Sequence, residues 1–178
     1  LLDTQVEAGI HGDFAKGWLI AQQLEKETPD CQRAAFNRGW YLLQHGNLLE
    51  GHKLLDQGRF QNVFGNGHIG SEKPIWNGEE GTVLLNMEGG LGDQINGYRW
   101  AFDLKKRGNR VVISCSPELA SMFAENFPVV GHNAACSVYH DYWLPSMSAI
   151  VPLGYEYKDL KGEPYIERTA DSIPGRIG

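Results

Sequence analysis

Cysteine is scarce in this chain, and long apolar runs are missing. Only Cys31, Cys115 and Cys136 occur among 178 residues, and their spacing does not match a zinc site or a redox pair. We therefore expect buried, reduced thiols, as in cytosolic proteins. No apolar segment approaches the roughly 20 residues needed to cross a bilayer. These absences predict a cytoplasmic protein without a membrane span.

Strong charge and the common ligand-binding motifs are also missing. The formal net charge is −6, and no run of lysine or arginine indicates a nucleic-acid or anionic-membrane partner. No Asp-x-Asp pair or cluster of His and Cys is present, so no metal site is predicted. The dinucleotide pattern G-x-G-x-x-G would need glycine where Ile95 stands, and no Gly-Lys-Ser/Thr forms a phosphate loop. We therefore expect no bound cofactor.

One stretch organises the rest of the chain. Residues 82–88 form a mostly apolar run that predicts a buried strand, and Gly89, Gly90 and Gly92 then interrupt it. Apolar residues recur at helical spacing from Leu91 until a basic last turn at 105–107. Strand, glycine turn and helix are the opening unit of a Rossmann-like sheet, in which ligands bind at this edge.

The region after this unit continues the alternation of strands and helices. Residues 110–115 predict a second strand, Pro117 opens a helix, and further short strands are expected at 127–130 and 137–143. A short helical turn is expected at 146–150. Alternating strands and helices indicate an α/β fold with a mainly parallel sheet. We assign residues 81–178 to this Rossmann-like domain.

Residues 1–62 predict helices only. Turns at Gly12-Asp13 and Gly46-Asn47 interrupt two amphipathic patterns at an offset of about 34 residues. With Gly39, Leu42 and Gly51, the segment resembles the tetratricopeptide repeat. Glycines replace the usual alanines at positions 17, 51 and 58. The glycine-rich residues 63–80 are expected to form a linker, in which Trp76 anchors the chain on a domain face.

From Pro74 onward, the chain resembles the N-terminal half of a GT-B glycosyltransferase, in the group where tetratricopeptide repeats precede the transferase. The resemblance is carried by these residues: Pro74, Trp76, Gly78, Glu88-Gly89-Gly90-Leu91-Gly92-Asp93-Gln94-Ile95, His140-Asp141-Tyr142, Leu144-Pro145-Ser146-Met147, Pro152-Leu153-Gly154 and Pro164-Tyr165-Ile166. The glycine turn is also similar to that of the heptosyltransferases. One residue departs from the group, which commonly has Gln where Gly89 stands.

The resemblance implies an activity and a site. Asp93 corresponds to the proposed catalytic base that takes a proton from the acceptor, and the substrate-binding residues would be Glu88, Gly89, Gly90, Leu91, Gly92 and Gln94. The substrates would be a nucleotide-sugar donor and an acceptor glycan or protein. The donor would be held by a C-terminal domain that starts near residues 176–178. Because both ends of the chain look cut, this fragment is expected to be inactive alone.

Other interpretations of the same residues stay open. An aspartate at this position also serves as an ordinary helix cap, and Glu88 could simply cap the strand. The chain could be a non-catalytic interaction module that binds a protein through its helical repeats and keeps a remnant Rossmann-like scaffold. It could also bind a small molecule without transferring a sugar.

Overall fold

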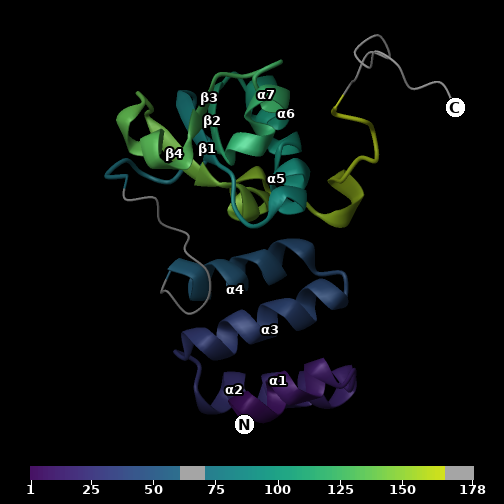
Figure 1. Cartoon of the computed structure of the whole chain (residues 1–178). Helices are drawn as coiled ribbons and strands as arrows, with labels where there is room; N and C mark the ends of the chain where they lie inside the picture. The colour runs from purple at the N-terminus through teal and green to yellow at the C-terminus, as the bar shows by residue number, and fades with distance from the viewer. Residues whose placement is uncertain (61–70, 167–178) are drawn as a thin grey trace, which may run out of the picture.

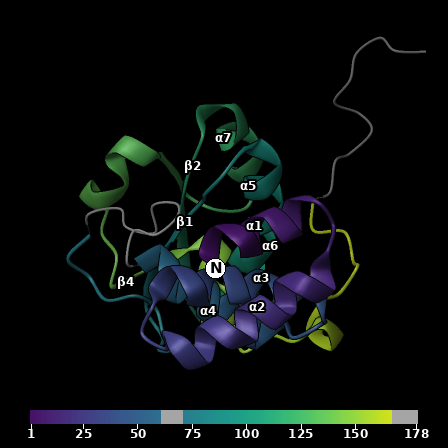
Figure 2. The same ribbon diagram turned by 90° about the horizontal axis from the view of Figure 1, so that it is seen from below.

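The computed structural model describes residues 1–60 and 71–166, which form a helical segment followed by an α/β region. The helical segment contains α1 (Leu2–Ile10), α2 (Phe14–Glu27), α3 (Gln32–Gln44) and α4 (Leu48–Phe60). In Figure 1 these helices lie in layers below the sheet, with α4 nearest to it. The view from below shows them in front of the α/β region (Figure 2). The predicted order, helices first and then a parallel sheet, is confirmed.

Glycines determine how the helices meet. Gly12 and Gly46 end the first helix of each pair with φ values of +75° and +84°, so the turns predicted at both positions are present. At Gly17, an added Cβ would lie 1.9 Å from the Tyr41 hydroxyl oxygen. At Gly58 it would lie 2.6 Å from the Cβ of Phe36. Side chains larger than glycine are disfavoured at both positions because these neighbours fill the space.

The α/β region is built on one parallel sheet. Its strands are β1 (Thr82–Asn86), β2 (Arg110–Cys115), β3 (Val129–Gly131) and β4 (Tyr142–Pro145), in the order β3-β2-β1-β4. Helices α5 (Leu91–Gly97), α6 (Arg99–Lys106) and α7 (Pro117–Phe123) connect the first three strands, and η1 (His132–Ser137) precedes β4. Short helices η2 (Ser146–Ser148), α8 (Ile150–Leu153) and η3 (Tyr157–Asp159) follow.

Strand β1 is buried on both sides, as its apolar sequence predicts. Val83 and Leu85 face a large core that includes Ala101 and Leu104 of α6 and Phe123 of α7. On the opposite side, Leu84 packs in a smaller cluster with Ala135 and Trp143. The sheet therefore has two covered faces, which leaves the ends of its strands as the places for a site.

Two sequence-based boundaries were wrong. The single helix expected from Leu91 is divided at Tyr98 into α5 and α6, and Leu91 is 46% exposed. The strand expected at 137–143 starts only at Tyr142. Before it, His140 Nδ1 bonds the Val138 carbonyl, and the backbone N–H of Asp141 donates to the Thr82 carbonyl at 2.9 Å. The regular ladder with β1 begins only after these contacts, with Tyr142 opposite Val83.

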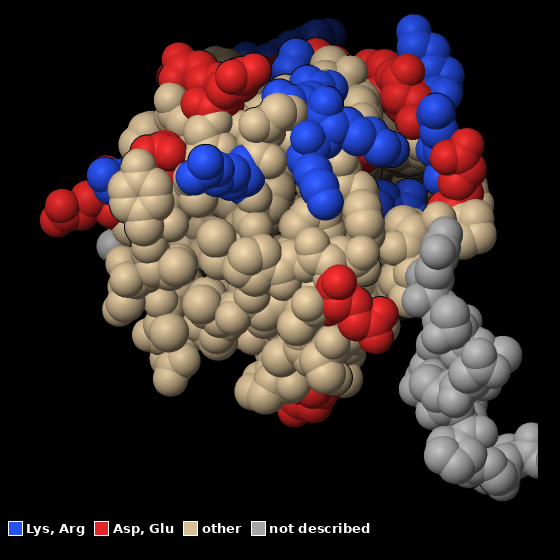
Figure 3. Space-filling view, turned by 90° about the horizontal axis from the view of Figure 1, so that it is seen from above, with Lys and Arg blue, Asp and Glu red and all other residues tan. Residues whose placement is uncertain are grey.

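The end of the predicted linker packs on the sheet. Ile75 forms a parallel bridge with Trp143, and Trp76 is 1% exposed, as expected for an anchor. The first part of that linker, and the expected start of a C-terminal domain at 176–178, lie outside the described residues. Within the described ranges, no helix is both long and apolar enough to cross a membrane. On the face seen from above, basic and acidic side chains lie beside each other (Figure 3).

Candidate functional site

The carboxyl ends of the four strands define the candidate site. The strand order reverses around β1, because β2 and β3 lie on one side of it and β4 on the other. In open parallel sheets, ligands bind outside the carboxyl ends at such a switch point. The segments that meet there are the glycine turn, residues 87–93 after β1, and residues 146–148 after β4. The sequence thus placed the glycine turn at the edge of the sheet where a ligand is expected.

The glycines of this turn have different roles. Gly89 has a φ of +73°, and an added Cβ would lie 2.6 Å from Asp93 Oδ2 and 2.8 Å from Met147 Cε. A larger residue is therefore disfavoured there by both backbone and space. At Gly92 an added Cβ would meet nothing within 4 Å, and at Gly90 its nearest neighbour would be Asp93 Oδ2 at 3.7 Å. Gly90 and Gly92 leave the outer surface of the turn open.

Asp93 lies exposed at the start of α5. Its Oδ2 accepts a hydrogen bond from the backbone N–H of Gly90 at 2.9 Å, so the carboxylate does cap the helix. Among the described residues, its second oxygen has no hydrogen-bond partner. Capping and proton acceptance are therefore compatible, since one oxygen holds the turn while the other faces solvent.

Glu88 is engaged on the opposite side of the turn. Its Oε1 pairs with Arg59 Nη2 from α4, and its Oε2 accepts from the Met147 N–H at 3.1 Å. Its own N–H donates to Ser146 Oγ at 3.1 Å. With 10% of its side chain exposed, Glu88 ties the helical segment to the ends of β1 and β4.

Gln94 and Leu91 complete the predicted set. Gln94 is 2% exposed, donates to the Gly89 carbonyl and to Ser116 Oγ, and accepts from the Ser116 N–H at 3.0 Å. This side chain clamps the turn after β1 to the end of β2. Leu91 lies on the surface beside Gly92. The predicted residues are therefore neighbours in one turn, but Glu88 and Gln94 are occupied by structural contacts.

A buried polar cluster beside the turn was not predicted. Arg59 Nη1 donates to Ser148 Oγ at 2.7 Å and to Asp56 Oδ1 at 3.3 Å, and Ser148 Oγ donates to Asp56 Oδ1 at 2.7 Å. Together with Glu88, these residues form the junction cluster: Asp56, Arg59, Glu88 and Ser148. Arg59 is 7% exposed. The available signal was its position next to Gly58 on the buried face of α4.

The junction cluster contains two carboxyl groups and one guanidinium. Burial raises the pKa of Asp56 from 3.8 to about 6, and the negative charge of Glu88 acts in the same direction. Arg59 and the Ser148 hydroxyl oppose this shift. Nearby on α4, burial and the charge of Arg59 lower the pKa of His52, which favours its neutral form. The junction therefore changes charge near pH 6.

A second polar group at this edge, formed by Asn86, Ser114 and His132, was also not predicted from the sequence. Ser114 Oγ donates to Asn86 Oδ1 at 2.6 Å and lies 3.5 Å from His132 Nδ1. Burial lowers the pKa of His132, so its imidazole is mainly neutral at pH 7. His132 follows β3 directly, and the alternation of strands alone would have placed it at the carboxyl edge. Ser114 is fully buried and stays a structural partner.

Two exposed groups at this edge, the Asp93 carboxylate and the mainly neutral His132 imidazole, can accept a proton. Asp93 has an oxygen available to accept a proton, whereas Glu88 is ion-paired and nearly buried. Within residues 1–60 and 71–166, no group of three or more His, Cys, Asp or Glu side chains is arranged to hold a metal ion. No protein-family model matches the chain, and comparisons with curated proteins and with solved structures find no match.

Proposed function

We propose that this chain is the acceptor-side part of a GT-B glycosyltransferase, which transfers a sugar from a nucleotide-sugar donor when a C-terminal domain completes the cleft. Asp93 is the base that accepts the proton of the acceptor hydroxyl. Gly90, Leu91 and Gly92 form the open surface on which the acceptor lies. Glu88, Gly89 and Gln94 hold the turn in shape. The site has no resident cofactor, and the location is cytoplasmic.

The observation that supports this proposal most is the position of Asp93. Its carboxylate is exposed at the carboxyl end of β1, next to the point where the strand order reverses. Gly90 and Gly92 carry no side chains and leave space for a sugar on this side of the turn, while Leu91 and Met147 lie exposed nearby. General bases need a free oxygen within hydrogen-bond reach of the substrate, and Asp93 offers one. Tetratricopeptide-like packing of the helical segment is part of the same proposal.

A second candidate function is favoured by the surface of the helical segment. Among the aromatic side chains of its helices, Phe36 and Tyr41 are buried. Trp40 and Phe14, however, are 52% and 46% exposed, and Ile10 is 75% exposed. Exposed apolar residues mark a protein-binding surface where they form a contiguous patch, and the second candidate function assigns that role to these residues. In this alternative the chain is an interaction module, and the glycine turn has no catalytic role.

The test is sugar transfer by the longest native form of the protein, with Asp93→Asn and Asp13→Asn compared. Asp13 is a matched control because its carboxylate also caps a helix, accepting from the Lys16 N–H at 3.2 Å. We expect Asp93→Asn to lower the transfer rate at least about 100-fold, the usual scale for removing a general base. Asp13→Asn should keep the wild-type rate. Equal rates in both variants would show that Asp93 only caps the helix and is not the base. This result would favour the interaction module.

A further test concerns the chain of 178 residues by itself. Mixed with a panel of nucleotide-sugars and acceptors, it should give no turnover, because the proposal places the donor on another domain. Sustained product formation would contradict this division of the site.

A further inference from the structure

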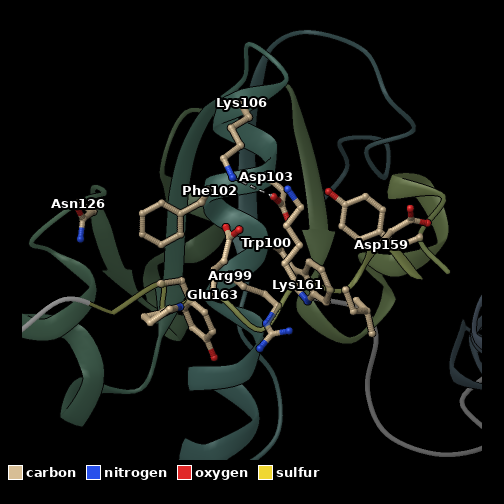
Figure 4. Close-up of a pocket in the computed structure, with 13 residues that line it drawn as sticks. Arg99, Trp100, Phe102, Asp103, Lys106, Asn126, Asp159, Lys161 and Glu163 are labelled. Carbon is tan, nitrogen blue, oxygen red and sulfur yellow. Dashed lines mark ion pairs between the residues drawn. The ribbon is translucent and has the colours of Figure 1, made fainter. Parts of the chain in front are cut away.

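A cavity lies on the outer side of α6, away from the glycine turn. It has a volume of about 530 Å³ and lies between α6 and the strap, the segment 155–166 that follows α8. Figure 4 shows side chains from the helix and from the strap converging on it. Its volume falls in the range of small-molecule sites. None of its lining residues belongs to the site proposed for sugar transfer.

Arg99 is the feature of this cavity that most needs an explanation. Its guanidinium carbon lies 4.8 Å from the ring centroid of Tyr165 and 5.8 Å from that of Trp100. Its Nε is buried without a hydrogen-bond partner, and within the described part of the chain Arg99 makes no ion pair. Aromatic contacts restrict the guanidinium, and its terminal Nη groups, which have no hydrogen-bond or ion-pair partner among the described residues, stay available for an anion.

The two other cations of the cavity, Lys161 and Lys106, also lack a close ion-pair partner among the described residues. Lys161, from the strap, has no ion-pair partner among the described residues, and Lys106 reaches Asp103 only at 3.8 Å. Three cations thus line the cavity together with the carboxylates of Asp103, Asp159 and Glu163. Of these carboxylates, Asp159 accepts from the Glu156 N–H at 3.0 Å.

This mixture of charges restricts the class of ligand that the cavity can bind. An anion alone would be attracted by the cations but repelled by the carboxylates. A ligand with an anionic group and several hydroxyl groups satisfies both, because phosphate oxygens accept from Arg99 and Lys161 while hydroxyls donate to Asp159 and Glu163. The rings of Phe102 and Tyr155 add apolar walls to the same cavity.

We propose that the cavity between α6 and the strap binds a sugar phosphate, with Arg99 and Lys161 holding the phosphate group. The site is separate from the glycine turn and does not depend on the proposed transfer activity. A bound ligand bridges α6 and the strap, so it also fixes the strap on the α/β region.

The experiment is an NMR titration of the chain at physiological salt, which follows the Arg99 Nε–H and the Trp100 indole N–H. The probes are glucose 6-phosphate, ribose 5-phosphate, inorganic phosphate and glucose. We expect saturable shifts with at least one sugar phosphate, at least about tenfold weaker binding of inorganic phosphate, and no binding of glucose. If neither sugar phosphate saturates these signals, the proposal is wrong.

Variants separate this site from binding elsewhere. Arg99→Met should weaken binding of the sugar phosphate at least about tenfold, and Lys161→Met about threefold. Lys161 is exposed, so its replacement keeps the test valid even where Arg99→Met loosens the packing of Trp100. Lys158→Met is the control, because Lys158 is also an exposed lysine of the strap but does not line the cavity. Equal affinities in all three variants would overturn the assignment.

Discussion

The interior of the sheet and its junction with the helical segment are stabilised by different means. Val83, Leu84 and Leu85 of β1 are fully buried among apolar side chains. A few residues further along the chain, Glu88 is buried in a polar cluster with Arg59, Asp56 and Ser148. Apolar burial contributes stability at any pH, whereas a buried charge contributes only while it is paired. The sheet is therefore a constant scaffold, and the junction depends on conditions.

The largest loss of stability is expected from a substitution in the apolar core of the sheet. Leu85→Ala removes a fully buried side chain from the main core and should lower the free energy of unfolding by about 3–5 kcal/mol. Urea denaturation measures this loss. Leu19→Ala is the control, because Leu19 is 66% exposed and its replacement should change stability by less than about 0.5 kcal/mol. Similar losses in both variants would contradict the description of the core.

The junction should be nearly as sensitive when its cation is removed. Arg59→Met leaves the buried carboxylate of Glu88 without its ion-pair partner, and we expect a loss of about 3 kcal/mol at pH 7. Hydrogen exchange should show the loss first in α4 and in residues 87–89, while β2 stays protected. A variant as stable as the wild type would show that the junction cluster does not connect the two regions.

The pH dependence of stability tests the same cluster with a smaller effect. Because the pKa of Asp56 rises from 3.8 to about 6 on folding, the folded chain keeps a proton that the unfolded chain has released between these values. This group therefore lowers stability as pH rises from about 4 to about 6, and its full penalty is present above pH 6.

Asp56→Asn removes this titration. Its free energy of unfolding should exceed that of the wild type by about 2–3 kcal/mol at pH 8, with the difference shrinking toward pH 4. Urea midpoints at several pH values measure it. An advantage of the variant that grows toward low pH would reverse the sign and contradict the role given to Asp56.

The sequence predicts what depends on local pattern. The apolar run 82–86, the glycine cluster and the turns at Gly12 and Gly46 are local signals, and the structure has a strand, a turn and two helix boundaries there. The ion pair that occupies Glu88 was not predictable, because its partner Arg59 lies 29 residues earlier in the chain. The delayed start of β4 has the same origin, since it depends on contacts between Asp141 and Thr82. Long-range polar contacts leave no periodic trace in a sequence.

The two carboxylates of the glycine turn provide the closest test of this account. Glu88→Gln and Asp93→Asn are equivalent chemical changes at sites of opposite burial. Glu88→Gln should lower stability by about 2 kcal/mol, since it removes the charge that Arg59 pairs with. Asp93→Asn should change stability by less than about 0.5 kcal/mol, because the amide oxygen can still accept from the Gly90 N–H.

The most direct measurement is the rate of sugar transfer by these two variants in the longest native form of the protein, with each rate compared with the stability of the same variant. We expect Asp93→Asn to lose transfer while its stability is unchanged, and the folded fraction of Glu88→Gln to retain transfer. Wild-type transfer by Asp93→Asn would contradict this expectation.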